Sequence, residues 1–154
     1  MRKKNLYVSL IIILLTGSFL SFADAPGKKK QIISVVKQFC KVLESRDVEV
    51  AKQVLMPTGI SFSLRHEGET RTLKTSQFRD LINRMPNLKE EYKEVIHDPK
   101  VLINDGIAVV WARYEFFRDG KFSHCGVDAF SLMETLQGWK IAAVIYTVEK
   151  ADCK

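Results

Sequence analysis

Alternating apolar and polar residues, divided by turn signals, run through the second half of the chain and predict a sheet. Asp119-Gly120 is a strong two-residue hairpin signal between two long apolar-rich stretches. Asn104-Asp105-Gly106 and Gln137-Gly138 supply further turns on either side of this hairpin. These signals predict a meander of three or four antiparallel strands. The expected strands span 92–103 with an interruption at Asp98-Pro99, 107–117, 122–135 and 139–148.

The first half of the chain has mainly helical patterns. Apolar residues from Ile32 to Leu43 recur at three- and four-residue spacing, which predicts one buried helical face. Ile60, Phe62 and Leu64 alternate with polar residues and predict a strand that buries this apolar face. Helices before strands predict an α+β domain with helices packed on one face of a curved sheet. The expected elements are a helix over 31–45, a short helix from Asp47 to Leu55, strands at 60–65 and 70–73, and a helix capped by Thr75 or Ser76 and ended by Pro86.

The N-terminal segment has the pattern of a signal peptide. Arg2-Lys3-Lys4 is a basic region, and the mostly apolar stretch 6–20 follows it. Ser21-Phe22-Ala23 favours cleavage after Ala23; cleavage after Ala25 and an uncleaved anchor are the alternatives. The mature protein is expected to be periplasmic or secreted, without stable membrane insertion. The expected divisions are a signal peptide over 1–23, a flexible mature N-terminus over 24–30, the folded domain over 31–150 and a tail over 151–154.

The charge of the chain gives little support for a nucleic-acid partner. The formal net charge is +6, and residues 1–23 carry three basic and no acidic residues, so cleavage would leave +3. The run Lys28-Lys29-Lys30 would then lie at the mature N-terminus. We therefore expect no basic face for nucleic acid.

Three cysteines in an exported chain leave at least one cysteine unpaired. Cys40 falls inside the first helical pattern, where cysteine usually behaves as a small buried apolar residue. Cys125 and Cys153 are the favoured disulfide pair, with three free thiols as the alternative.

The order of these elements resembles a known superfamily. A helix, a short helix, a strand pair, a helix and a long meander closing with Gly138-Trp139-Lys140-Ile141 are similar to the nuclear transport factor 2-like, or SnoaL-like, superfamily over residues 31–148. The resemblance implies a cone-shaped, strongly curved mixed or antiparallel sheet, with three helices from the N-terminal half packed on its concave face. It also implies a pocket on that face and, often, a homodimer. Members include isomerases, dehydratases, cyclases, epoxide hydrolases and non-catalytic binding modules, so the fold does not choose a function.

His124, Cys125 and Asp128 lie close together in the sequence and suggest a reactive cluster. On a strand, however, His124 and Asp128 share one face about 13 Å apart, while Cys125 points to the other face. One metal ion cannot be held by both His124 and Asp128 at that separation. The sequence also has no Gly-rich phosphate loop, nucleophile elbow, CxxC or zinc-ligand spacing. We expect neither a metal nor a cofactor.

Two-residue hairpins would fix the partners of these side chains. They place His124 opposite Glu115, and Asp128 opposite Trp111 and Thr147. A single bulge would exchange the faces and bring Tyr114 into the pocket in place of Arg113 and Glu115. The mixed charges at Lys89–Glu91 and Lys93-Glu94 are expected on a solvated surface. The candidate pocket residues are Trp111, Arg113, Tyr114, Glu115, His124, Asp128, Phe130 and Thr147.

The sequence is compatible with three functions. The first is a non-catalytic binding or accessory module that holds a small, partly apolar molecule. The second is a cofactor-free lyase or isomerase in which Asp128 or His124 transfers a proton. The third is a protein interface, most often a homodimer, on the outer sheet face. The apolar stripe expected on that outer face is Val110, Tyr114, Phe116, Val144 and Tyr146.

Overall fold

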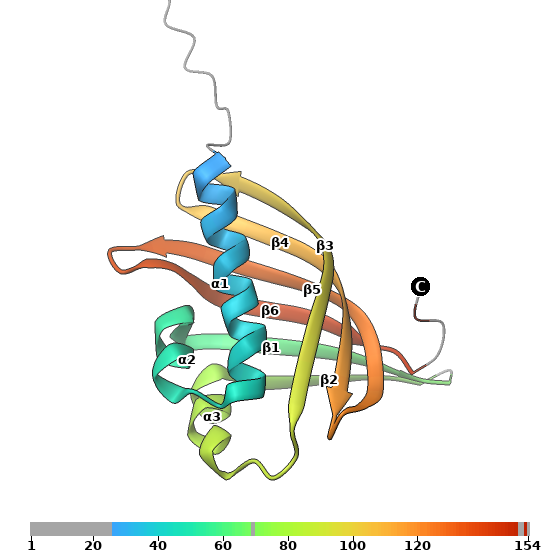
Figure 1. The fold of residues 1–154 in the computed structure, drawn as a ribbon. Helices are drawn as coiled ribbons and strands as arrows, with labels where there is room; N and C mark the ends of the chain where they lie inside the picture. The colour runs from blue at the N-terminus through green and yellow to red at the C-terminus, as the bar shows by residue number, and fades with distance from the viewer. Residues whose placement is uncertain (1–25, 69, 151–152, 154) are drawn as a thin grey trace, which may run out of the picture.

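The computed structural model describes residues 26–68, 70–150 and 153 (Figure 1). Within these residues the chain forms three helices, a short 3-10 turn and six strands. The helices are α1 (Pro26–Ser45), α2 (Val48–Val54) and α3 (Phe78–Arg84), and the 3-10 turn is Met85–Asn87. The strands are β1 (Leu55–Glu67), β2 (Thr70–Gln77), β3 (Tyr92–Asn104), β4 (Ile107–Arg118), β5 (Lys121–Thr135) and β6 (Gly138–Val148).

The sheet is mixed and open, with the strand order β2-β1-β6-β5-β4-β3. β1 runs parallel to β6, and the other neighbouring strands are antiparallel. Figure 1 shows the strands curving around the side on which the helices lie. The predicted α+β class, the meander and the three helices on the concave face are confirmed. The core packs Ile32 and Val36 of α1 against Phe130 and Leu132 of β5, and all four are almost completely buried.

The Asp119-Gly120 turn lies where the sequence predicts it. Both residues have positive φ, 48° and 72°, as a type I′ hairpin requires. Asp119 also fixes the start of β3, because its backbone N–H donates to the Glu91 carbonyl at 2.9 Å. The Glu91 N–H in turn donates to the Asp119 carboxylate at 2.8 Å.

A bulge at Ser123 changes the predicted partners of β5. Phe117 pairs with Phe122 as expected, but the next residue of β4, Phe116, pairs with His124 and leaves Ser123 without a partner. Beyond the bulge every β4 partner moves by one residue, and the opposite face of β4 meets the pocket side of β5. The predicted pairs Glu115–His124 and Trp111–Asp128 are therefore wrong.

The register of β6 also differs from the prediction. The turn is Leu136-Gln137 instead of Gln137-Gly138, because Thr135 pairs with Gly138. A second irregularity leaves Ala142 without a partner on β5. As a result Asp128 lies opposite Tyr146 and not opposite Thr147.

The apolar face expected on the first strand is turned outward. Ser61, Ser63 and Arg65 lie on the concave side of β1, next to Val144, Tyr146 and Val148 of β6. Ser63 is only 2% exposed, whereas Phe62 lies beside the exposed Ile145 on the convex side. β1 also begins at Leu55, where the sequence favoured the end of a helix, because Leu55 pairs with Ile141 of β6. After an irregularity the pairing resumes at Ile60 and continues to Arg65.

The first helix extends into the segment predicted to be a flexible mature N-terminus. Residues 1–25, and with them the predicted signal peptide, lie outside the described residues. The first helix begins at Pro26 and therefore includes most of the segment predicted to be flexible, 24–30. Proline suits the first turn of a helix, and Lys28 Nζ lies 2.9 Å from a Glu134 carboxylate oxygen. No helix among the described residues is both long and apolar enough to span a bilayer.

Cys125 and Cys153 form a disulfide, with their Cα atoms 5.8 Å apart. Cys125 also exchanges both backbone hydrogen bonds with Glu149 at 2.9 Å, so the end of the chain is held beside β5. Among the described residues, the free cysteine is the buried Cys40 on α1.

Candidate functional site

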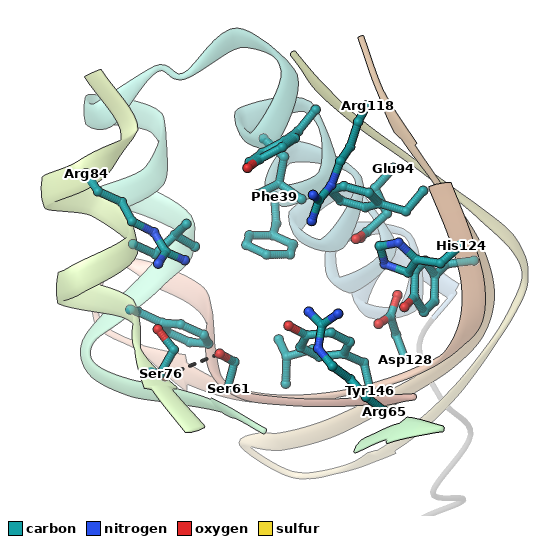
Figure 2. A pocket seen from close by; sticks show the side chains of 17 residues that line it. Phe39, Ser61, Arg65, Ser76, Arg84, Glu94, Arg118, His124, Asp128 and Tyr146 are labelled. Atoms are coloured by element: carbon teal, nitrogen blue, oxygen red, sulfur yellow. Dashed lines mark hydrogen bonds between the residues drawn. The ribbon is translucent and has the colours of Figure 1, made fainter. Parts of the chain in front are cut away.

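A cavity of about 220 Å³ opens between the helices and the concave face of the sheet. α1 and α3 form one side of it, and residues of all six strands form the rest (Figure 2). Its apolar lining is Phe39, Leu43, Phe78, Leu81, Phe116 and Val144. Its polar and aromatic-hydroxyl lining is Ser61, Arg65, Ser76, Arg84, Tyr92, Glu94, Tyr114, Arg118, His124, Asp128 and Tyr146.

Three of the residues assigned to a pocket from the sequence line this cavity: Tyr114, His124 and Asp128. His124 and Asp128 come from the same face of β5, as the period of two requires. Tyr114 comes from β4 because the Ser123 bulge brings its face inward.

The other assigned residues lie elsewhere, which corrects the prediction. Trp111 is 53% exposed on the convex face. On the same face Arg113 lies 3.3 Å from an Asp98 carboxylate oxygen, and Glu115 lies 3.3 Å from His97 Nε2. The remaining two do not reach the cavity. Phe130 is completely buried in the core, and the Thr147 carbonyl lies behind Tyr114, accepting a hydrogen bond from its hydroxyl at 2.6 Å.

Asp128 is the most constrained polar group of the cavity. Only 2% of the residue is exposed, and its Oδ2 atom is buried without a hydrogen-bond partner among the described residues. Burial raises the pKa of this carboxyl well above its ordinary value, and the nearby charge of Glu94 raises it further. The neutral form of Asp128 is therefore favoured, and in that form the carboxyl can donate one hydrogen bond into the cavity.

Glu94 is a second cavity carboxyl, which the sequence placed on a solvated surface. Glu94 shares the concave face of β3 with Tyr92 and Ile96, which lie two residues before and after it. This period of two in the sequence could have predicted that Glu94 points inward. Burial raises the pKa of Glu94 to about 7, while a hydrogen bond from the Cys40 thiol at 3.3 Å opposes the shift.

His124 is held as a neutral imidazole. Burial lowers its pKa to about 4, and the positive charges of Arg118, Arg65 and Lys150 act in the same direction. The ring stacks on Phe116 with centroids 4.8 Å apart, and its Nδ1 lies 3.0 Å from the Ser123 hydroxyl. Figure 2 shows Glu94, His124 and Asp128 on the same side of the cavity.

Gly126 allows strands β5 and β6 to approach each other closely beside His124 and Asp128. Gly126 lies between His124 and Asp128, and a Cβ atom there would overlap the backbone carbonyl of Thr147. The same carbonyl accepts the Tyr114 hydroxyl, so the phenol is fixed in place. Burial raises the Tyr114 pKa, with the charges of Asp128 and Glu94 acting in the same direction, and Tyr114 stays un-ionised.

The described residues contain no group of three or more His, Cys, Asp or Glu side chains that could hold a metal ion. Asp128, Glu94 and His124 can supply hydrogen bonding and proton transfer in the cavity, beside an apolar wall.

The arrangement of helices and sheet has close counterparts among solved structures. A nuclear transport factor 2-like superfamily protein from Salmonella enterica serovar Typhimurium superposes with a TM-score of 0.63 at 13% identity, over 82% of this chain and 94% of that one. A similar protein from Cytophaga hutchinsonii gives 0.65 at 16% identity, over 79% and 98%. This chain has the nuclear transport factor 2-like fold.

A third structure with the nuclear transport factor 2-like fold is described as a candidate dehydratase. It comes from Streptomyces avermitilis and matches with a TM-score of 0.60 at 18% identity, over 79% of this chain and 96% of that one. No protein-family model matches this chain, and no curated protein matches it either. At such low identity the comparison establishes the fold, which hosts many functions.

Proposed function

We propose that the protein binds a small, partly apolar molecule in the cavity beside Asp128. The observation that carries the proposal is the buried Asp128 Oδ2 atom, which has no hydrogen-bond partner among the described residues. Leaving a buried polar atom unpaired costs about 1–3 kcal/mol, and a ligand with a matching donor or acceptor would recover that loss. The Phe39, Phe78 and Val144 side chains offer an apolar surface for the rest of the molecule.

A fragment screen by amide NMR tests this proposal. We expect fragments that combine a hydroxyl or carbonyl with a ring to shift the amide signals of Glu94, His124 and Asp128. Replacing the carboxyl in Asp128→Leu should weaken these fragments at least about fivefold, because the hydrogen bond is lost. The matched control is Asp98→Asn, since the Asp98 side chain is 85% exposed on β3. A screen in which no fragment shifts the cavity amides would refute the proposal.

A second candidate function is a cofactor-free lyase or isomerase. It is favoured by two cavity groups whose environments move their pKa values in opposite directions: the pKa of Asp128 is raised and that of His124 is lowered. Asp128 would supply a proton while His124 accepts one. We expect the wild type, but not Asp128→Asn, to exchange a carbon-bound hydrogen of a bound molecule with D₂O. An ordinary pKa for Asp128, measured by carboxyl ¹³C NMR, would contradict this function.

Export belongs to the same proposal. We propose that 1–23 is removed as a signal peptide and that the mature protein is periplasmic or secreted, on the basis of the sequence pattern. The Cys125–Cys153 disulfide supports an oxidising compartment. Sequencing the mature N-terminus tests the cleavage site. Asp24 as the first residue is the expected result, and an intact Met1 would contradict it.

We also propose a homodimer through the outer face of the sheet, as the sequence suggested, but with other residues in the interface. Val110, Tyr114 and Val144 of the predicted outer stripe are buried, and Phe116 and Tyr146 line the cavity. The convex face instead carries Trp111, Ala129, Ile145 and Phe62 side by side on four neighbouring strands. Trp111 and Ile145 are more than half exposed, and such a patch favours an interface. Sedimentation should give a dimer that Trp111→Glu dissociates, whereas a wild-type monomer would refute it.

A further inference from the structure

Three arginines reach the cavity from three different elements. Arg65 lies on β1, Arg84 in the last turn of α3 and Arg118 at the end of β4. Figure 2 shows their side chains extending toward the middle of the cavity from three sides. Residues this far apart in the sequence are brought together only by the fold.

None of these three guanidinium groups has a carboxylate partner among the described residues. The ion pairs of that part of the chain involve other cations, such as Arg113 with Asp98. The Arg65 Nε atom is buried and has no hydrogen-bond partner there. Arg118 is supported from one side by the Tyr92 ring, whose centroid lies 5.6 Å from its guanidinium carbon.

The other ionisable groups of the cavity do not neutralise this charge. Two carboxyls, Asp128 and Glu94, face three guanidinium groups, and burial raises the pKa of both, which disfavours their charged forms. His124 is neutral because its pKa is lowered to about 4. The cavity therefore has an excess of positive charge at neutral pH. Unpaired guanidinium groups at a partly enclosed site are suited to bidentate binding of carboxylate or phosphate.

We propose that the ligand is an organic anion whose carboxylate or phosphoryl group binds Arg65, Arg84 and Arg118 while its apolar part packs on the Phe39 and Phe78 rings. The inference rests on the proposed small-molecule binding and adds the chemical class of the molecule. The anionic group binds near the arginines, and a hydroxyl or carbonyl at the other end of the ligand can reach Asp128.

A matched set of compounds tests this class. Isothermal titration would compare 2-naphthoate, 2-naphthyl phosphate and the neutral 2-naphthamide, which share one ring system. We expect the anions to bind at least about tenfold more tightly than the amide. Added salt should weaken the anions and leave the amide nearly unchanged. The two anions distinguish a carboxylate ligand from a phosphorylated one.

Arginine variants then locate the anionic group. Arg65→Gln should weaken the preferred anion about tenfold, because Arg65 is the most buried of the three, and should leave the amide unaffected. Arg84→Gln and Arg118→Gln should show smaller losses of the same kind. Arg79→Gln is the matched control, since Arg79 lies on α3, is exposed and bonds only to Gln77 in the described part of the chain.

The outcomes separate this inference from the proposed function. Equal affinity for anion and amide, with cavity amides shifted by both, would overturn the anion class and leave small-molecule binding standing. An equal loss in Arg79→Gln would also overturn it. No binding by any of the three compounds would overturn both proposals for molecules of this size.

Discussion

Replacing Glu94 with glutamine should remove most of a pH-dependent loss of stability. Glutamine keeps the shape of the side chain and an oxygen that can accept the Cys40 thiol hydrogen bond, but it cannot ionise. Burial raises the pKa of Glu94 from 4.5 to about 7. Its protonated form therefore contributes stability that is complete below pH 4.5 and is lost as the pH rises through about 7.

The size of the effect follows from that difference. At about 1.4 kcal/mol for each pH unit, ionising Glu94 in the fold costs about 3 kcal/mol of unfolding free energy. Urea denaturation of wild type and Glu94→Gln, at fixed ionic strength from about pH 4.5 to about pH 8, would measure it. The difference in unfolding free energy between the two proteins should grow by about 3 kcal/mol, with the variant more stable at the alkaline end.

Comparing the two proteins at each pH separates Glu94 from the other titrating groups. His124 acts in the opposite direction, because its pKa is lowered, so wild-type stability alone would hide part of the effect. Glu91→Gln is the matched control, since the Glu91 side chain is exposed. A difference in unfolding free energy between Glu94→Gln and wild type that stays constant across this pH range would show that burial does not raise the pKa of Glu94.

Three further changes have defined outcomes. Gly126→Ala should lower the unfolding free energy by about 3 kcal/mol or more, because the added Cβ atom meets the fixed Thr147 carbonyl. Thermal denaturation measures this loss, and a loss no larger than that of Gly106→Ala would contradict the prediction. Reducing the Cys125–Cys153 disulfide should cost about 3 kcal/mol and add two hydrogens to the intact mass, whereas an unchanged mass would mean free thiols. In His124→Gln, stability should fall less than in wild type as the pH drops from 6.5 toward 4, because the buried imidazole no longer has to be protonated on unfolding. Parallel acid profiles for the two proteins would show that His124 is not desolvated.

Local sequence patterns predicted the elements well and the strand register poorly. The Asp119-Gly120 turn was predictable because two consecutive positive φ angles favour few residue pairs. The shared face of His124 and Asp128 followed from the period of a strand alone. The start of β1 at Leu55 could not be predicted from local periodicity, because the pairing of β1 with β6 joins distant parts of the chain.

The faces of the sheet were ambiguous because both carry apolar residues. On β4, Val109 and Trp111 alternate with Val110 and Ala112, so hydrophobicity does not identify the inner face. The Ser123 bulge decides between them, and one extra residue leaves no mark in an alternating pattern. Tyr114 was therefore predicted only under the alternative that included a bulge. Arg65, Arg84 and Arg118 were missed because they come from three separate elements.

A crystal structure of residues 24–154 grown with 2-naphthoate would show where an apolar anion binds. We expect the ring against Phe39 and Phe78, and the carboxylate within hydrogen-bonding distance, about 3 Å, of at least one guanidinium of Arg65, Arg84 or Arg118. An empty cavity, or the compound bound only on the convex face around Trp111, would contradict this expectation.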